Sequence, residues 1–397
     1  MSAYLDHAAT TPVLPEAAAV LAEHLTRPGN PSSLHTSGRA ARRVVEESRE
    51  RLAAALGARP SEVLLTGGGT EADNLAIKGL YWARTAQDPA RTRVLVSAVE
   101  HHAVLDPAAW LAEHEGADLV LLPVDDRGRL RTDALAAELA AHGDRTALVS
   151  VMWANNEVGT LQPVAEVVAL AHAHGVPVHV DAVQAVGQVP VDFAASGVDA
   201  LTVSGHKLGG PGGVGALVAR RDLALVPVQH GGGQERGVRS GSLDVPGIAA
   251  FGVAVERAVA DREQTAARLA ALRDALVAGV LAVVPDAVLR GATGAGERLP
   301  ANAHLTFPGC EGDSLLYLLD AAGVECSTGS ACQAGVPQPS HVLLAMGVPE
   351  GDARGALRFS LGRTSTRDDV DALLAVLPGV VERARAAGLA AGRPADR

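Results

Sequence analysis

Two polar stretches of this sequence carry residue types that could take part in covalent chemistry. The first, ECSTGSACQAG over 325–335, holds two of the three cysteines of the chain among small residues. A free cysteine is usually a buried, inert side chain, whereas a thiol on an exposed, flexible segment is more often kept for its reactivity. The stretch alone leaves both interpretations of Cys332 open.

The second stretch, LTVSGHKLGGPGG over 201–213, places Lys207 between an apolar run and a glycine-rich turn. An arbitrary loop lysine is most often solvated, and burial of a lysine needs a specific reason. Here the turn is too tight for bulky neighbours, and polar residues gather at the ends of the surrounding apolar runs. We therefore treat Lys207 as a candidate for amine chemistry.

A glycine-rich segment, GGGTEADN, follows the apolar run EVLLT and leads into a helical pattern. Free backbone N–H groups at a helix N-terminus form a cradle for phosphate, to which Gly69 and Thr70 would contribute. The segment is neither GxGxxG nor GKS/T, so it indicates neither a dinucleotide nor a nucleoside triphosphate. A plain glycine turn with Thr70 as the helix N-cap explains it equally well.

Polar residues end three other apolar runs: His101 after RVLVSA, Asn156 after TALVSVM, and Asp181 with Gln184 after VPVHV. Ligands of α/β proteins gather at such strand ends. One interpretation is a metal site formed by His101, His179 and Asp181, but the spacing matches no known ligand pattern. A lysine, a strand-end aspartate and a phosphate cradle are instead the parts of a pyridoxal phosphate site.

The elements that must position these residues follow from the alternation of short apolar runs with longer amphipathic runs. This β-α-β-α order predicts an α/β protein with a mainly parallel, seven-stranded sheet between helices. The strands are expected at 62–66, 93–98, 118–124, 146–152, 176–181, 199–204 and 214–219, and the helices at 37–56, 70–83, 104–114, 132–141 and 164–174.

The pattern changes near residue 246 and predicts a smaller α+β domain. It contains a long helical region over 249–281, a strand at 301–307, a helix at 313–321, a strand at 356–361 and a helix from Thr366. We expect three parts: an N-terminal segment, 1–15, that packs with the small domain, a large cofactor-binding domain, 16–260, and a small C-terminal domain, 261–397, whose loop at about 326–338 carries Cys332.

Composition excludes several classes of function. The net charge of −11 argues against nucleic acid or an anionic membrane surface as the main partner. No apolar run approaches the roughly 18 residues of a membrane span, and the N-terminus has no signal-peptide pattern. Three cysteines in 397 residues, without a CxxC pair, do not form a disulfide framework. We therefore expect a cytoplasmic globular protein.

The chain resembles the cysteine desulfurases of the NifS/IscS type, which are class-V aminotransferases and fold-type-I pyridoxal phosphate enzymes. The resemblance covers nearly the whole chain, from YLDHAATTP to ALRFSLGRTST. The combination of motifs is specific for the family, whereas no single motif is. In the order of the family they are GNPSSLHTSGRAAR, TEADNLAIKG, EHHAVLD, NNEVGTLQP, HVDAVQAVG, SGHKLGGPGGVGAL, GGGQERGVRSGS, STGSACQAG and PSHVLLAMG.

The resemblance implies a role for each matching residue. Lys207 would bind pyridoxal 5′-phosphate as a Schiff base, His101 would stack on its ring, and Asp181 would keep the ring nitrogen protonated. Arg358 would bind the substrate carboxylate as a bidentate fork, helped by Asn30. The remaining contacts to the ring, the substrate or the phosphate would come from Gly69, Thr70, Asn156, Gln184, Ser204, His206 and Ser242.

The resemblance also implies a homodimer, because Ser242 would reach the phosphate bound in the neighbouring subunit. Cys332 would be the nucleophile that takes the sulfur of L-cysteine as a persulfide and leaves L-alanine. The persulfide would pass to an acceptor protein, for iron–sulfur cluster assembly or for thiolation of tRNA or a cofactor. No resident metal is expected, although Cys332 could ligate a nascent iron–sulfur cluster.

Some positions depart from the family pattern. TGGGT replaces the usual TSGAT, Ser242 replaces a threonine but keeps the hydroxyl, and His7 replaces a common tyrosine. Cys326 is not part of the family pattern, and two interpretations of it are open: a structural residue, or a second redox-active thiol. Cys310 is expected to be structural.

Two other functions compete with the desulfurase: a lyase or aminotransferase of the same fold, and a non-catalytic module that has kept the fold. The thiol of GSAC argues against a transaminase, which has no need for it. The presence of Lys207, Asp181, His101 and Cys332 argues against a non-catalytic module.

Overall fold

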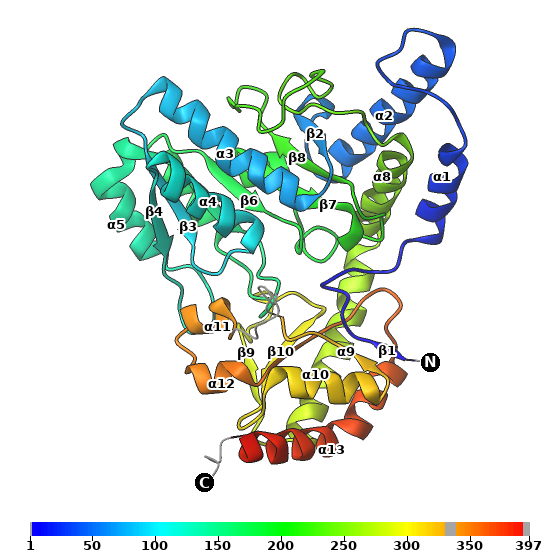
Figure 1. Cartoon of the computed structure of the whole chain (residues 1–397), viewed down its shortest axis with the longest axis vertical. Helices are drawn as coiled ribbons and strands as arrows, with labels where there is room; N and C mark the ends of the chain where they lie inside the picture. The colour runs from blue at the N-terminus through cyan, green and yellow to red at the C-terminus, as the bar shows by residue number, and fades with distance from the viewer. Residues whose placement is uncertain (1, 330–338, 392–397) are drawn as a thin grey trace.

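The computed structural model describes residues 2–329 and 339–391, the last four of them by their backbone alone. Figure 1 shows an upper region built on a seven-stranded sheet and a lower region built on a three-stranded sheet, each with its own helices. The α/β architecture predicted from the alternation of apolar and amphipathic runs is therefore confirmed.

Seven strands form the upper sheet: β2 Val63–Thr66, β3 Arg93–Ser97, β4 Asp118–Leu122, β5 Thr146–Met152, β6 Val178–Asp181, β7 Ala200–Ser204 and β8 Gly215–Ala219. Their spatial order is β2-β8-β7-β6-β5-β3-β4. All pairs are parallel except those of β8, which runs antiparallel to both neighbours. Strands buried on both faces read as continuous Val, Leu and Ala runs, so each predicted bound lies within two residues of the observed one.

Helices cover both faces of this sheet: α1 Pro15–Leu25, α2 Thr36–Ala55, α3 Gly69–Gln87, α4 His102–Glu115, α5 Thr132–His142, α6 Val164–His172, α7 Phe193–Ser196 and α8 Val245–Ala260. Val94 and Val96 of β3 pack with α3 and α4. Leu95 between them packs into the core that α2, α5, α6 and α8 share. Successive residues of a strand face opposite sides of a sheet, so these two helix groups lie on opposite faces.

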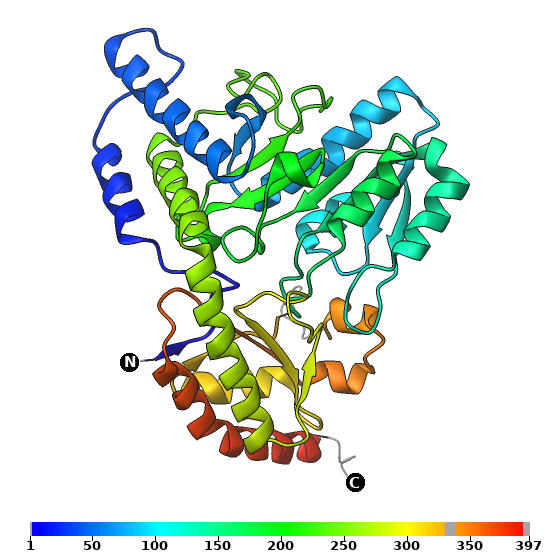
Figure 2. The same cartoon turned by 180° about the vertical axis from the view of Figure 1, so that it is seen from behind.

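The helical region expected over 249–281 is in fact two helices, α8 and α9 Arg262–Val283, which meet at Asp261. The backbone N–H of Asp261 donates to the carbonyl of Arg257, and its carboxylate pairs with the Arg257 guanidinium at 2.8 Å. Figure 2 shows the two helices following one path from the upper region into the lower region. Only Asp261 separates the two helices, so the apolar pattern continues across the break and does not reveal it.

The lower region has an antiparallel sheet of β9 Val288–Arg290, β10 Asn302–Thr306 and β12 Ala356–Ser360, in the order β12-β10-β9. Phe307, Leu315 and Leu373 are buried in its core, to which Leu5 of the N-terminal segment also contributes. No helix within 2–329 or 339–391 is both long and apolar enough to cross a membrane. The remaining elements are β1 Ala3–Tyr4, α10 Gly312–Ala321, β11 Val324–Glu325, α11 His341–Ala345, α12 Glu350–Arg354 and α13 Arg367–Ala391.

Candidate active site

A pocket of about 410 Å³ lies at the carboxyl ends of β5, β6 and β7. Met152, Asp181 and Ser204, which end these three strands, all line it. Parallel strands end together at one edge of a sheet, and α/β proteins bind their ligands there. The pocket is lined by ten of the residues singled out in the sequence: Gly69, Thr70, His101, Asn156, Asp181, Gln184, Ser204, His206, Lys207 and Arg358.

Lys207 ends the short 3₁₀ turn Gly205–Lys207, which directly follows β7. Its Nζ donates to the carbonyl oxygens of Ala8 at 2.6 Å and Ala9 at 2.7 Å. Burial, and then the positive charge of Arg358, lower the pKa of Lys207 to about 8. Near pH 8 about half of the amine is therefore uncharged, which is the nucleophilic form.

Asp181 is 7% exposed, and its Oδ1 accepts a hydrogen bond from the backbone N–H of Val183 at 2.8 Å. Burial raises the pKa of Asp181 to about 6, although the Val183 N–H and the charge of Lys207 act in the opposite direction. At neutral pH Asp181 is thus an anion, and it can pair with a cation placed in the pocket.

A buried polar network lies beside Asp181. Asp73 of α3 is 1% exposed, and its Oδ1 lies 3.5 Å from Nε2 of His179. Burial, and then the charge of Asp181, raise the pKa of Asp73 well above its usual range, whereas burial lowers the pKa of His179 to about 3. Of these three groups, Asp181 is therefore the one that carries a charge near neutral pH.

His179 does not support the alternative of a metal site. Its Nδ1 lies 2.9 Å from Oγ of Ser150, and its Nε2 lies 3.0 Å from Oγ1 of Thr202. Both ring nitrogens thus have hydroxyl partners. Across the described ranges of the chain, no three His, Cys, Asp or Glu side chains are grouped so that they could hold a metal ion.

The N-terminus of α3 forms a cradle beside Lys207. Gly68, with a φ of 144°, adopts a conformation that favours glycine and leads the chain into the helix. A Cβ on Gly69 would lie 3.1 Å from Val183 and 3.4 Å from Cβ of Ser204, so a side chain would fill this space. The first N–H groups of a helix have no partner within the helix. With the hydroxyls of Thr70 and Ser204 they suit a phosphate group.

Arg358, in the middle of β12, presents a cation to the pocket although it is only 5% exposed. One terminal nitrogen donates to the carbonyl of Asn156 at 3.0 Å, and the other to Oδ1 of Asp6 at 2.8 Å. Its Nε is buried and finds no partner among the described residues. The guanidinium therefore already binds one carboxylate, that of Asp6, and a substrate carboxylate could take the place of this partner.

Two histidines of the pocket are neutral near pH 7. Nδ1 of His101 accepts from the N–H of Ala103 at 3.1 Å at the start of α4, and Nδ1 of His206 lies 3.3 Å from Oγ1 of Thr10. Burial, and then the charge of Lys207, lower the pKa of each histidine to about 4. An uncharged His101 ring can stack on an aromatic ligand without placing a positive charge against it.

Three predicted site residues do not line this pocket. Asn30 lies in the connection between α1 and α2, and Ser242 lies in the connection before α8, and both are exposed. Cys332 lies outside the described residues. In a single chain, the pocket therefore has no contact with Asn30, which the resemblance assigns to the substrate. It also has no contact with Ser242, which the resemblance assigns to the phosphate of the neighbouring subunit.

The other two cysteines are buried, with Cys310 at 3% and Cys326 at 8% exposure. Burial raises the pKa of Cys310, and it raises the pKa of Cys326 to about 12. Thiols of this kind stay protonated near neutral pH and behave as packing groups. The structure therefore favours the interpretation of Cys326 as a structural residue over that of a second reactive thiol.

Three buried or half-buried acids of this region, Asp6, Asp73 and Glu157, received no role from the sequence, although Glu157 follows a predicted strand directly after Asn156. Glu157 is 2% exposed and accepts a hydrogen bond from Oγ of Ser340 at 2.5 Å. The same Oγ accepts from the N–H of Leu343, so Glu157 ties the start of α11 to the end of β5. All three acids lie within recognised motifs, but the pattern alone does not separate them from solvated carboxylates.

Comparisons with known proteins agree with this geometry. The model of the family Aminotransferase class-V matches residues 3–373. An IscS-like cysteine desulfurase of Mycobacterium tuberculosis is 60% identical over 389 residues, which are 98% of each chain. A cysteine desulfurase IscS of Methanosarcina thermophila is 43% identical over 96% of this chain and 92% of that one. A solved structure of a NifS-like protein, 34% identical, matches with a TM-score of 0.89 over 96% of this chain and 100% of that one.

Proposed function

The chain belongs to the aminotransferase class-V family, and we propose that it is a cysteine desulfurase that converts L-cysteine to L-alanine and passes the sulfur to an acceptor. The observation that carries this proposal is the single pocket that gathers Lys207, Asp181 and Arg358 beside the cradle at the start of α3. Relatives named cysteine desulfurase match nearly the full length of the chain, so the proposal does not depend on a shared fold alone.

Enzymes of this family use pyridoxal 5′-phosphate, and the residues of the pocket fit it. Lys207 would hold the cofactor covalently, the cradle with Gly69 would hold its phosphate, Asp181 would pair with its ring nitrogen, and His101 would cover one face of the ring. The space beside Gly69, which a Cβ would fill, supports this assignment. When bound, the cofactor supplies an electron sink that stabilises negative charge on the substrate.

The residues of the chain supply orientation, proton transfer and the sulfur acceptor. Arg358 binds the substrate carboxylate, and Lys207, with a pKa of about 8, can give up and take back a proton near neutral pH. The bond between carbon and sulfur of L-cysteine breaks while a sulfur–sulfur bond to Cys332 forms. The products are L-alanine and a persulfide on Cys332, so the step balances without an external oxidant.

Two finer proposals accompany this activity. We propose that the persulfide serves iron–sulfur cluster assembly or thiolation in the cytoplasm, and the name IscS of the relatives supports cluster assembly. We also propose the division of the chain into a segment over 1–15, a large domain over 16–260 and a small domain over 261–397. Separate hydrophobic cores around the two sheets support this division.

We expect the purified protein, loaded with pyridoxal phosphate, to be yellow and to form equal amounts of alanine and sulfide from L-cysteine in the presence of a reducing thiol. Borohydride reduction should fix the cofactor on Lys207, because the only other lysine of the chain, Lys78, does not line the pocket. Quantitation of alanine and sulfide and peptide mapping check both points. Release of pyruvate and ammonia, or transfer of the amino group to a keto acid, would contradict the desulfurase assignment.

We further propose a homodimer in which each subunit completes the other's site. The block over 231–242 is fixed to its own subunit, because both terminal nitrogens of Arg49 bind the Glu235 carboxylate and Arg239 binds Glu71 at 2.6 Å. The end of this block, Ser242, is nevertheless exposed and lies outside the pocket of its own chain. A rigid block with an exposed hydroxyl suits a contact across an interface.

Mixing Lys207→Ala subunits, which should be inactive, with Ser242→Ala subunits, which should be impaired, should give more activity than either variant has alone. In a hybrid dimer, one site combines an intact Lys207 with an intact Ser242 from the partner, and the other site carries both defects. We expect activity to rise toward half of the wild-type value per hybrid dimer, measured as alanine formation after subunit exchange. Full activity at concentrations where sedimentation shows only monomer would overturn the proposal.

A further inference from the structure

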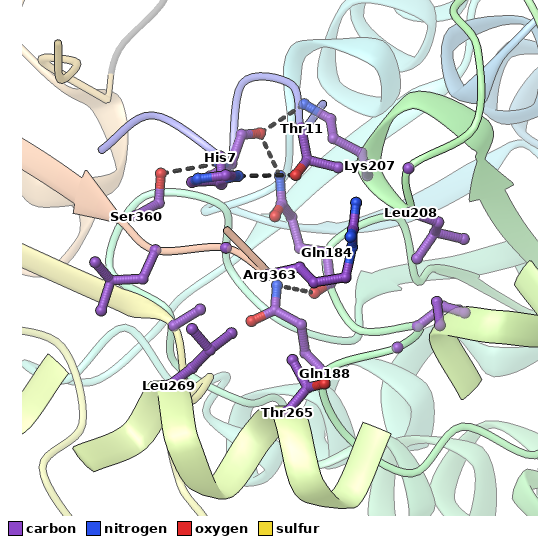
Figure 3. Close-up of a pocket in the computed structure, with 18 of the residues that line it drawn as sticks. His7, Thr11, Gln184, Gln188, Lys207, Leu208, Thr265, Leu269, Ser360 and Arg363 are labelled. Carbon is purple, nitrogen blue, oxygen red and sulfur yellow. Dashed lines mark hydrogen bonds between the residues drawn. The ribbon is translucent and has the colours of Figure 1, made fainter. Parts of the chain in front are cut away.

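The groups around the cradle at the start of α3 offer little positive charge to balance a phosphate. His206 is neutral near pH 7, because its pKa is lowered to about 4. Nζ of Lys207 donates to the carbonyls of Ala8 and Ala9, so the amine is directed toward the N-terminal segment (Figure 3). The Ala8 carbonyl also accepts from Nε2 of Gln184 at 2.9 Å. The cradle thus depends mainly on N–H groups and hydroxyls, and it is sensitive to any other charge placed close to it.

The carboxylate of Glu71 is such a charge, because it lies in the first turn of α3. Its Oε2 accepts a hydrogen bond at 2.8 Å from the backbone N–H of Gly67, in the turn that leads into the helix. A Cβ on Gly67 would lie 2.7 Å from the same oxygen, so the carboxylate occupies space that the serine of the usual family pattern would need. The first turn of a helix is the positive end of its dipole and attracts anions. Glu71 therefore competes with a phosphate for this positive end.

Arg239 binds both oxygens of the Glu71 carboxylate. Its Nε donates to Oε1 at 2.6 Å, and one terminal nitrogen donates to Oε2 at 3.3 Å. The arginine and glutamate side chains are only 14% and 31% exposed, so solvent screens the pair incompletely. Among the described residues, Arg239 alone forms an ion pair with Glu71. Binding at two points fixes the carboxylate and cancels its charge.

The guanidinium of Arg239 is held in place by its own block, 231–242. The backbone N–H of Arg239 donates to the carbonyl of Glu235 at 3.2 Å, and its carbonyl accepts from the Glu235 N–H at 2.9 Å. Gly241 has a φ of 122°, and a Cβ on it would lie 3.3 Å from a terminal nitrogen of Arg239. Glycine therefore leaves room for the guanidinium, and the block presents Arg239 to Glu71 in a fixed geometry.

We propose that Arg239 is a positioning residue for the cofactor phosphate, because it fixes and neutralises Glu71 and so leaves the positive end of α3 available. Arg239 does not line the active-site pocket, and it acts through Glu71. A phosphate monoester carries about two negative charges near pH 8, so a Glu71 carboxylate without its arginine would repel it. The inference rests on the cofactor of the proposed function, but not on its sulfur chemistry.

The test is equilibrium dialysis of the holoenzyme at pH 8 against decreasing concentrations of pyridoxal phosphate, which gives the Kd of the cofactor. Arg239→Gln should raise this Kd about tenfold or more, since juxtaposed like charges are costly. Glu71→Gln should bind the cofactor at least as tightly as the wild type, because its amide oxygen can still accept from Gly67 and carries no charge. The double variant with both substitutions should return to within about threefold of the wild type.

Arg236→Gln is the matched control for the loss of charge. It removes a guanidinium from the same block, but Arg236 donates to the carbonyl of Ser61 and forms no ion pair with Glu71. Its Kd should stay within about twofold of the wild type, as for most surface substitutions. Pyridoxal, which lacks the phosphate, is the matched ligand, and Arg239→Gln should bind it as the wild type does.

The proposal is overturned if Arg239→Gln binds pyridoxal phosphate as tightly as the wild type, or if the double variant binds it no better than Arg239→Gln. The second result would make the pair a clamp that stabilises the fold only. Glu71→Gln decides the same question even if Arg239→Gln does not fold, because loss of a clamp would weaken binding in this variant too. Binding is measured without L-cysteine, so a negative result would leave the desulfurase proposal standing, and an enzyme without desulfurase activity would leave this one standing.

Discussion

Cys332→Ser is expected to lower the rate of sulfide release about 1000-fold, because a serine hydroxyl is a weak nucleophile at its free pKa. The residues that surround the active-site pocket are unchanged, so the variant should fold, bind the cofactor and stay yellow. It should still show a spectral change when L-cysteine is added, since Arg358 and Lys207 remain. Sulfide release and absorption spectra of the same preparation measure the two effects separately.

The two other cysteines provide matched controls for this prediction. Cys310→Ser and Cys326→Ser should keep most of the activity, because both thiols are buried and protonated near neutral pH. Each places a hydroxyl in an apolar site and should cost roughly 1–3 kcal/mol in the free energy of unfolding. Mass spectrometry after brief exposure to L-cysteine should find the added sulfur on the peptide with Cys332. Sulfur found only on Cys326, or wild-type turnover by Cys332→Ser, would show that Cys332 is not the acceptor.

The fold could be predicted from the sequence wherever local pattern and burial agree. Apart from the half-exposed edge strand β4, the strands of the upper sheet are buried on both faces and therefore read as continuous apolar runs. The main strands and helix of the lower region were predicted to within one residue. The pair of β1 with β11 could not be predicted, because two residues on each side carry no periodicity and only their tertiary contact defines the pair. The break at Asp261 also escaped, because no glycine or proline marks it.

The candidate site was predictable to the extent that it consists of residues at strand ends. Asp181, Ser204 and Lys207 follow buried strands directly, so the topology of a parallel sheet brings them together. Asp6 could not be assigned in this way, because its partner Arg358 lies 352 residues away in the other sheet. Asp73 lies one turn inside α3, and only the burial of that face shows that its carboxyl group is close to His179.

Of the two neighbouring aspartates beside the pocket, Asp181 is charged near neutral pH and Asp73 is not, so we expect their isosteric asparagine variants to behave differently. Asp181→Asn should lower kcat/KM for L-cysteine at least about 100-fold, because loss of one preorganised electrostatic partner typically costs 10²–10³. In the wild type, the Asp181 carboxylate is an anion above about pH 6. The amide of the variant is neutral, so it could not balance a positive charge on the ring nitrogen of the cofactor. Asp73→Asn should stay within about threefold of the wild type, because burial and the charge of Asp181 already keep the Asp73 carboxyl group uncharged.

The measurement that distinguishes the two variants is kcat/KM for L-cysteine between pH 6 and pH 9, together with the absorption spectrum of each holoenzyme. The amide of Asp73→Asn has the shape of a protonated carboxyl group and can still donate toward the neutral ring of His179, whose Nε2 lies 3.5 Å from Oδ1 of Asp73. Its pH profile should therefore follow that of the wild type, whereas Asp181→Asn should be impaired over the whole range. If Asp73→Asn lost as much activity as Asp181→Asn, Asp73 would carry a working negative charge, and Asp181 would not be the sole anion beside the cofactor.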